Sequence, residues 1–155
     1  MKGNDKIIET LNDLLSDELT AINQYMVHSS MCENWGYEKL HSVAEKRAIT
    51  EMKHAESLIE RILFLEGTPI VSNLKKISIG SRVEQQHAND LQAELGAVSA
   101  YNAGIRQAVE LGDNGSRELL ESILKDEEEH TDWLEAQLEQ IEHMGIQNYL
   151  VEQIG

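Results

Sequence analysis

The sequence predicts an all-α protein, and three observations lead to this fold class. The 155 residues include one proline and few aromatic residues, a composition that favours helix over sheet. Apolar residues recur every three to four positions over long stretches, and no stretch alternates with the period of two that a half-buried strand shows. The length is that of one domain, residues 1–155, which can bury a core of its own.

Four long helices follow one another along the chain, and turn-forming residues separate them. Gly36 follows the first helix, Gly67 ends the second, and the run Gly112-Asp113-Asn114-Gly115-Ser116 separates the third from the fourth. After residue 145 a short amphipathic tail predicts a fifth, C-terminal helix. The four long helices are predicted at residues 5–34, 38–66, 82–111 and 115–144.

The connection between the second and third helices differs from the two short turns. Helical periodicity lapses from Gly67 to Ser81, and Thr68-Pro69 breaks the second helix. An extended segment of about 15 residues reaches ~50 Å, whereas a helix of about 28 residues is ~42 Å long. The segment can therefore cross the whole bundle, so that one long crossover joins two antiparallel helical hairpins.

The charge balance limits the possible partners. Thirteen basic and 28 acidic residues give a net charge of −15, which argues against nucleic acid or an anionic membrane as partner and suits cations. Cys32 is the only cysteine, and the charged N-terminal residues do not resemble a signal peptide. No apolar run approaches the ~20 residues that span a bilayer. We therefore expect a cytoplasmic protein.

The pattern Glu-x-x-His occurs four times, where chance supplies roughly one. Residues three apart on a helix project from the same face, so each pair can give one oxygen and one nitrogen to a single ion. Two pairs, Glu38 with His41 and Glu84 with His87, lie near helix beginnings. We expect those two histidines to be surface or helix-end residues without a metal role.

The other two pairs lie at the middle of their helices, as do two further glutamates on inward-facing apolar stripes. In antiparallel packing, mid-helix residues meet at one level, whichever way each helix runs. Four carboxylates and two imidazoles are therefore predicted to converge halfway along the bundle. These residues are Glu18, Glu51, His54, Glu94, Glu127 and His130.

The two predicted hairpins also match in register. The interval from Glu18 to Glu51 and the interval from Glu94 to Glu127 are both 33 residues. A tyrosine follows the first glutamate of each hairpin after seven residues. The sequence therefore predicts a site with pseudo-twofold symmetry.

Metal ions account for this cluster better than a set of buried, hydrogen-bonded polar groups. An unpaired buried carboxylate costs several kcal/mol, and four at one level also repel one another. Two divalent cations balance the four negative charges. Oxygen-rich ligation with one imidazole per metal is typical neither of structural zinc nor of calcium, which leaves iron or manganese.

The motifs at these positions resemble those of the bacterioferritins, over essentially the full length of the chain. That family has a ferritin-like four-helix bundle with a long crossover. The segments that carry the resemblance are Met1-Lys2-Gly3, Glu18-Leu19-Thr20-Ala21-Ile22-Asn23-Gln24-Tyr25, Glu51-Met52-Lys53-His54-Ala55, Ile59-Glu60-Arg61-Ile62-Leu63-Phe64-Leu65-Glu66-Gly67, Asp126-Glu127-Glu128, His130 and Gln147-Asn148-Tyr149-Leu150.

The resemblance implies roles for individual residues. Tyr25 matches a family tyrosine beside the metal centre, whose hydroxyl hydrogen-bonds a ligand carboxylate or supplies an electron. Met52 from two subunits is implied to bind one haem b through both thioether sulfurs, whereas an isolated methionine would more often fill a gap at an interface. The implied di-iron centre has Glu18 and His54 on one iron, Glu94 and His130 on the other, and Glu51 and Glu127 as bridges.

The resemblance also implies a homo-oligomeric shell of 24 subunits that stores ferric mineral. A small iron-sulfur ferredoxin then reduces the mineral through the haem. Some members carry an additional iron-binding His and Asp on the cavity surface, at the positions of Lys46 and Thr50. Their replacement here argues against that additional site.

The expected function is therefore iron storage by a ferroxidase, which oxidises Fe2+ with dioxygen or hydrogen peroxide. One alternative is a haem-carrying electron-transfer or scaffold subunit whose di-iron site is idle. Another is a di-iron oxygenase or small peroxide-scavenging bundle, which would form a particle much smaller than a 24-mer. The sequence leaves the working oxidant and the route of iron into the shell open.

Overall fold

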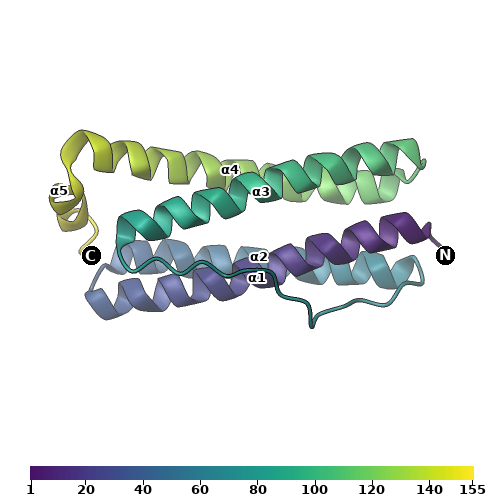
Figure 1. Cartoon of the computed structure of the whole chain (residues 1–155), viewed down its shortest axis with the longest axis horizontal. Coiled ribbons are helices and arrows are strands. Elements are labelled where there is room, and N and C mark those ends of the chain that lie inside the picture. Colours follow the sequence, from purple (N-terminus) through teal and green to yellow (C-terminus); the bar gives the residue numbers. More distant parts are fainter.

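The computed structural model describes residues 1–155 as four long helices and one short helix, which confirms the all-α ferritin-like bundle (Figure 1). Each long helix begins and ends within two residues of its predicted bounds. None of the helices has the length and apolar character needed to cross a membrane. The helices are α1 (Asp5–Trp35), α2 (Glu38–Phe64), α3 (Val83–Glu110), α4 (Asn114–Met144) and α5 (Ile146–Val151).

Short turns make α1 and α2 one antiparallel hairpin, and α3 and α4 the other (Figure 1). Each turn contains a glycine in the left-handed region, Gly36 with φ 85° and Gly112 with φ 71°, where a side chain would be strained. Asp113 caps α4, because its carboxylate accepts a hydrogen bond from the backbone N–H of Ser116 at 3.0 Å.

Two apolar clusters fill the bundle, and the polar cluster predicted above lies between them. The smaller apolar cluster consists of Cys32, Leu40, Val83 and Tyr149, near the end that α5 covers. The larger lies where the beginning of α1 meets the ends of α2 and α3 and the beginning of α4. Its buried members are Ile7, Leu11, Leu14, Leu15, Ala55, Leu58, Ile62, Leu65, Tyr101, Ala108, Leu120 and Ile123.

The crossover, residues 65–82, runs lengthwise along the bundle (Figure 1) and is held by a polar face of α1. Five α1 side chains hydrogen-bond the backbone of the crossover. They are spaced at four-residue intervals and therefore lie on one face of α1. This ladder fixes a segment that has no secondary structure of its own. Its bonds are Asn12 Nδ2 to Thr68 O (3.1 Å), Ser16 Oγ to Asn73 O (2.5 Å), Lys75 N to Thr20 Oγ1 (2.9 Å), Ser78 N to Gln24 Oε1 (3.0 Å) and Gly80 N to His28 Nε2 (3.0 Å).

Helix α5 packs across one end of the bundle through Tyr149, which is fully buried. Its hydroxyl lies 3.0 Å from His87 Nε2 and donates to Gln137 Oε1 at 2.6 Å. His87 lies near the beginning of α3, as expected, but the expectation that it lies at the surface is wrong, since it is only 6% exposed. His41 is half-buried, with Nδ1 2.9 Å from Ser29 Oγ.

Candidate metal centre

The structure places all six predicted ligands in the interior at mid-height of the bundle, and each is at most 8% exposed. One lies on α1, two on α2, one on α3 and two on α4, because each is the mid-helix residue of an inward stripe. The six are Glu18, Glu51, His54, Glu94, Glu127 and His130.

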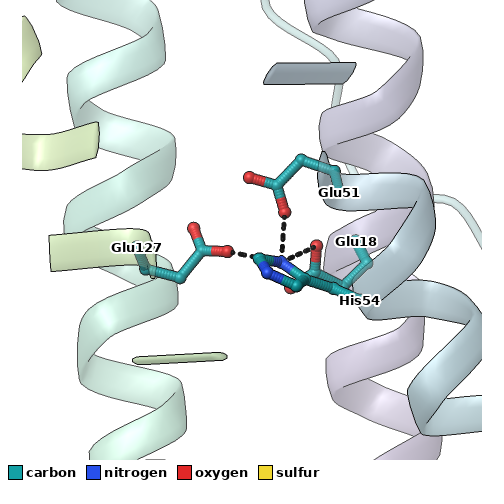
Figure 2. Close-up of side chains that lie close together, drawn as sticks. All are labelled: Glu18, Glu51, His54 and Glu127. Atoms are coloured by element: carbon teal, nitrogen blue, oxygen red, sulfur yellow. Dashed lines mark hydrogen bonds and ion pairs between the residues drawn. The ribbon is translucent and has the colours of Figure 1, made fainter. Parts of the chain in front are cut away.

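Four of them, Glu18, Glu51, His54 and Glu127, form a group whose ligand atoms all lie within 4.8 Å of one another (Figure 2). His54 Nδ1 is 3.1 Å from Glu51 Oε2, 3.1 Å from Glu127 Oε1 and 3.6 Å from Glu18 Oε2. One imidazole nitrogen and three carboxylate oxygens therefore surround a common point. This is a donor set for one divalent ion.

Asp126 orients the His54 ring from outside the cluster. Its Oδ2 lies 2.8 Å from His54 Nε2, so that Nε2–H donates to this carboxylate and Nδ1 faces the glutamates. A metal-ligating histidine is commonly held in this way through its second nitrogen. Asp126 belongs to a motif noted in the sequence, but only the tertiary contact reveals its position behind His54.

The protonation of His54 depends on its carboxylate neighbours. Burial by itself lowers the pKa of this imidazole, but hydrogen bonds to Glu127, Glu18 and Glu51 outweigh burial and raise its pKa well above the ordinary value. Without metal, His54 therefore carries a proton between the glutamates. A bound cation replaces that proton, so metal binding at this group releases it.

The remaining two predicted ligands, Glu94 and His130, form the other half of the centre. His130 Nδ1 is 3.1 Å from Glu94 Oε1 but is not aligned for a hydrogen bond. Unlike His54, His130 has no carboxylate at its second nitrogen. Its ring instead stacks on Trp133, with ring centres 6.0 Å apart.

Two buried tyrosines support the glutamates across the hairpins. The hydroxyl of Tyr25 donates to Glu94 Oε1, and that of Tyr101 donates to Glu18 Oε1 at 2.5 Å. Burial, together with the adjacent carboxylate, raises the pKa of each phenol well above its ordinary value. Both hydroxyls therefore remain protonated donors, and the pseudo-twofold arrangement extends to them.

Arg47 is a member of the cluster that the sequence reasoning missed. Its Nη2 lies 2.9 Å from Glu51 Oε1, 3.2 Å from Glu127 Oε2 and 3.5 Å from Glu94 Oε2. The signal was available, because Arg47 precedes Glu51 by four residues and so lies on the same face of α2.

The carboxylates of the centre fit a cationic group. Glu18 Oε2, Glu51 Oε1, Glu94 Oε2 and Glu127 Oε1 are buried without an aligned hydrogen bond, although some lie within ion-pair distance of Arg47 or His54. Burial, and then the charge of Glu18, raises the pKa of Glu51 to about 8. Buried carboxylate oxygens that lack donors are the environment that a divalent metal relieves.

A cavity of about 350 Å³ connects the centre with the side of the bundle that the crossover covers. Glu18, Glu51, Glu94 and Glu127 line it, together with residues of α1 and the crossover. Lys75 Nζ pairs there with Asp13 at 3.0 Å and with Asp17 at 2.6 Å. The cavity has room for hydrated ions beside the predicted ligands.

Met52 does not face the metal centre. Its side chain is 46% exposed, and Met26 on α1 and Ile49 on α2 are exposed apolar residues of the same hairpin. Lys46 is exposed, and the Thr50 hydroxyl donates to its backbone carbonyl at 3.1 Å.

Two helical hairpins joined by a long crossover, with glutamates and histidines at mid-height, define a ferritin-like protein, and the family model "Ferritin-like domain" matches residues 8–144. A bacterioferritin of Mycobacterium tuberculosis is 40% identical over 149 residues, which cover 96% of this chain and 94% of the relative. Bacterioferritins of Brucella melitensis and Rhodobacter capsulatus are each 40% identical, covering 96% of this chain and 92% of the relative. The chain belongs to the bacterioferritin family.

Proposed function

We propose that this protein is a ferroxidase that oxidises Fe2+ to Fe3+ and stores the product as mineral inside a shell of identical subunits, 24 in number. The observation that carries the proposal is the set of four buried glutamates, each of which has one oxygen without a hydrogen-bond donor. Such a set is unstable by itself and suited to two divalent ions. The name of the relatives supports iron as the ion.

In the proposed reaction Fe2+ is the substrate and each ion loses one electron. With hydrogen peroxide, two Fe2+ and two protons give two Fe3+ and two water molecules. With dioxygen, two Fe2+ and two protons give two Fe3+ and one hydrogen peroxide. The four carboxylates provide the negative charge that favours Fe3+ over Fe2+, and Tyr25 and Tyr101 hold two of them by hydrogen bonds.

Met52, together with the same residue of a second subunit, is the residue that would hold haem b. An exposed thioether among exposed apolar side chains fits a flat apolar group at a subunit boundary. Haem held there would supply a route for electrons from an iron-sulfur ferredoxin to the stored Fe3+.

Stopped-flow absorbance after mixing metal-free protein with Fe2+ and oxidant tests the ferroxidase. Glu18→Ala removes one predicted ligand and is expected to slow Fe3+ formation by roughly tenfold or more. Glu9→Ala is the matched control, because Glu9 is an exposed residue of the same helix, and its rate should equal that of the unmodified protein. Equal rates in all three proteins would exclude this centre as the site of oxidation.

The alternative is a haem-carrying electron-transfer or scaffold subunit with an idle centre. The contacts of Arg47 with three of the four glutamates favour it, since a permanent cation there reduces the need for metal. Purified protein that binds haem but oxidises no Fe2+ would establish this alternative.

A further inference from the structure

The supporting residues of the two halves of the centre differ, although the ligands match. The 33-residue interval within each hairpin relates α2 to α4 through Glu51 and Glu127. One residue before these glutamates, Asp126 of α4 corresponds to Thr50 of α2. The Asp126 carboxylate that pairs with His54 therefore corresponds to the Thr50 hydroxyl, which donates to a backbone carbonyl and not to His130.

A larger difference lies four residues before the same glutamates. There α2 carries Arg47, whereas α4 carries the buried apolar residue Ile123. The side chain of Arg47 is 10% exposed and its Nε makes no hydrogen bond. A buried guanidinium with an unpaired N–H is costly, and contacts with carboxylates must compensate for it.

The position of the guanidinium is specific. Glu51 Oε2 and Glu127 Oε1 face His54, whereas the second oxygens of the same two carboxylates, Glu51 Oε1 and Glu127 Oε2, face Arg47 Nη2. Glu94 Oε2 is the third oxygen near Nη2. By the symmetry of the centre, these three oxygens and His130 are the donors for a second ion.

We propose that Arg47 is an internal cation that competes with the second metal ion, so that the two ions bind in sequence. The inference rests on the proposed function and adds its regulation. The first ion binds tightly at Glu18, Glu51, His54 and Glu127, while the guanidinium holds the oxygens of the second position. The second ion binds only when Arg47 withdraws.

The net charge of the centre requires that Arg47 withdraw when the second ion binds. Four carboxylates carry four negative charges, so one divalent ion together with Arg47 leaves one negative charge, and two divalent ions without Arg47 leave none. Two ions together with Arg47 would place a net positive charge in the interior, which is unfavourable. Solvent lies close to the guanidinium, which makes its withdrawal feasible. Arg47 Nη1 donates to the backbone carbonyl of Asp126 at 3.3 Å, and the Asp126 side chain is 45% exposed.

The consequence is a threshold concentration of Fe2+, below which a subunit does not oxidise two ions together. At low Fe2+ concentration each subunit holds a single ion, which by itself supplies one electron to an oxidant that takes two. Paired oxidation begins only when the concentration of Fe2+ is high enough to displace Arg47. The protein then responds to excess iron rather than to traces of it.

Titration of metal-free protein with Co2+ under argon, followed by visible d–d absorption, tests the proposal without turnover. The unmodified protein is expected to bind one Co2+ per subunit tightly and a second at least roughly tenfold more weakly. Arg47→Gln should strengthen the second phase by a similar factor, so that the phases merge. Arg106→Gln, the same change at an exposed residue of α3, should leave both phases unchanged.

Arg47→Lys provides a second variant if the glutamine variant does not fold, as judged by circular dichroism. A lysine keeps the charge but cannot span several oxygens, so the second phase should become stronger, though less than with glutamine. Two equally tight Co2+ ions in the unmodified protein would overturn the role of Arg47 and leave the ferroxidase proposal intact. No Co2+ binding in any variant would overturn both.

Discussion

His87 shows how one residue acquires a property that its position in the sequence does not indicate. It lies on the first turns of α3, where exposure is common, but α5 covers it and Tyr149 pairs with its Nε2 at 3.0 Å. Burial, the dominant cause, lowers the pKa of this imidazole to about 4. The folded protein therefore holds His87 neutral at pH values where an exposed histidine is charged.

This pKa predicts a pH dependence of stability. Below the ordinary histidine pKa of about 6.5 the unfolded chain binds a proton that the folded chain binds only near pH 4, so stability is retained above pH 6.5 and lost as the pH falls toward 4. The loss amounts to about 3 kcal/mol. Urea unfolding of metal-free protein at pH 7 and pH 4 should show this loss, and His87→Gln should reduce it.

The protein also contains five other histidines and a buried cluster of carboxylates, so the comparison between variants is the informative measurement. His143→Gln serves as the control, because His143 is exposed near the end of α4. It should lose as much stability on acidification as the unmodified protein. An equal loss in the His87→Gln variant would contradict the assignment of the effect to His87.

At the scale of elements, the crossover depends on the polar ladder of α1 and on a close approach of backbones at Gly80. A Cβ atom added to Gly80 would lie 2.4 Å from the backbone nitrogen of Gln86. The N–H of Gly80 also donates to His28 Nε2, the last bond of the ladder. The crossover therefore reaches α3 only with glycine at this position.

Gly80→Ala is expected to destabilise the protein by about 1–3 kcal/mol, since neighbouring backbone must move. Gly96→Ala on α3 is the matched control. A Cβ there meets nothing within 4 Å, and alanine in a helix interior is more stable than glycine by roughly 0.5–1 kcal/mol. Thermal unfolding should therefore show a lower midpoint for Gly80→Ala and a higher midpoint for Gly96→Ala. A similar displacement of the midpoint in both variants would disprove the steric account.

For the whole molecule, the first hairpin exposes several large apolar side chains, and these are candidates for contacts between subunits. Met26, Ile49, Met52, Leu63 and Phe64 are each at least 43% exposed on α1 and α2. Apolar surface of this kind is typical of contacts between subunits. The proposed shell and the proposed haem site would both use it.

Met52→Leu is predicted to abolish the absorption bands of low-spin haem and to leave assembly intact, because leucine preserves the volume but removes the sulfur. Haem-reconstituted protein measured by absorbance after size exclusion gives both readouts. Met26→Leu, a change at the exposed methionine of α1, should retain the bands. Retention of the bands in the Met52 variant would eliminate Met52 as the ligand.

Most of the fold could be predicted from the sequence because it depends on local pattern. Apolar periodicity set the bounds of the helices to within two residues, and the length of the crossover set the connectivity. The height of the candidate metal centre along the bundle followed from the helix midpoints. It also followed from the 33-residue interval, which separates Glu18 from Glu51 and also Glu94 from Glu127. For the irregular crossover, only the distance that it can span was predicted. Its path could not be predicted, because it depends on hydrogen bonds to another helix.

The sequence by itself determined the four helices, the crossover and the convergence of six glutamate and histidine side chains, since residues three, four and seven apart on a helix share a face. Only the tertiary structure decided that Asp126 holds His54, that α5 buries His87 and that Arg47 Nη2 contacts three glutamates. These contacts join different helices, and their energies depend on burial and on the charges nearby, which no spacing along the chain records.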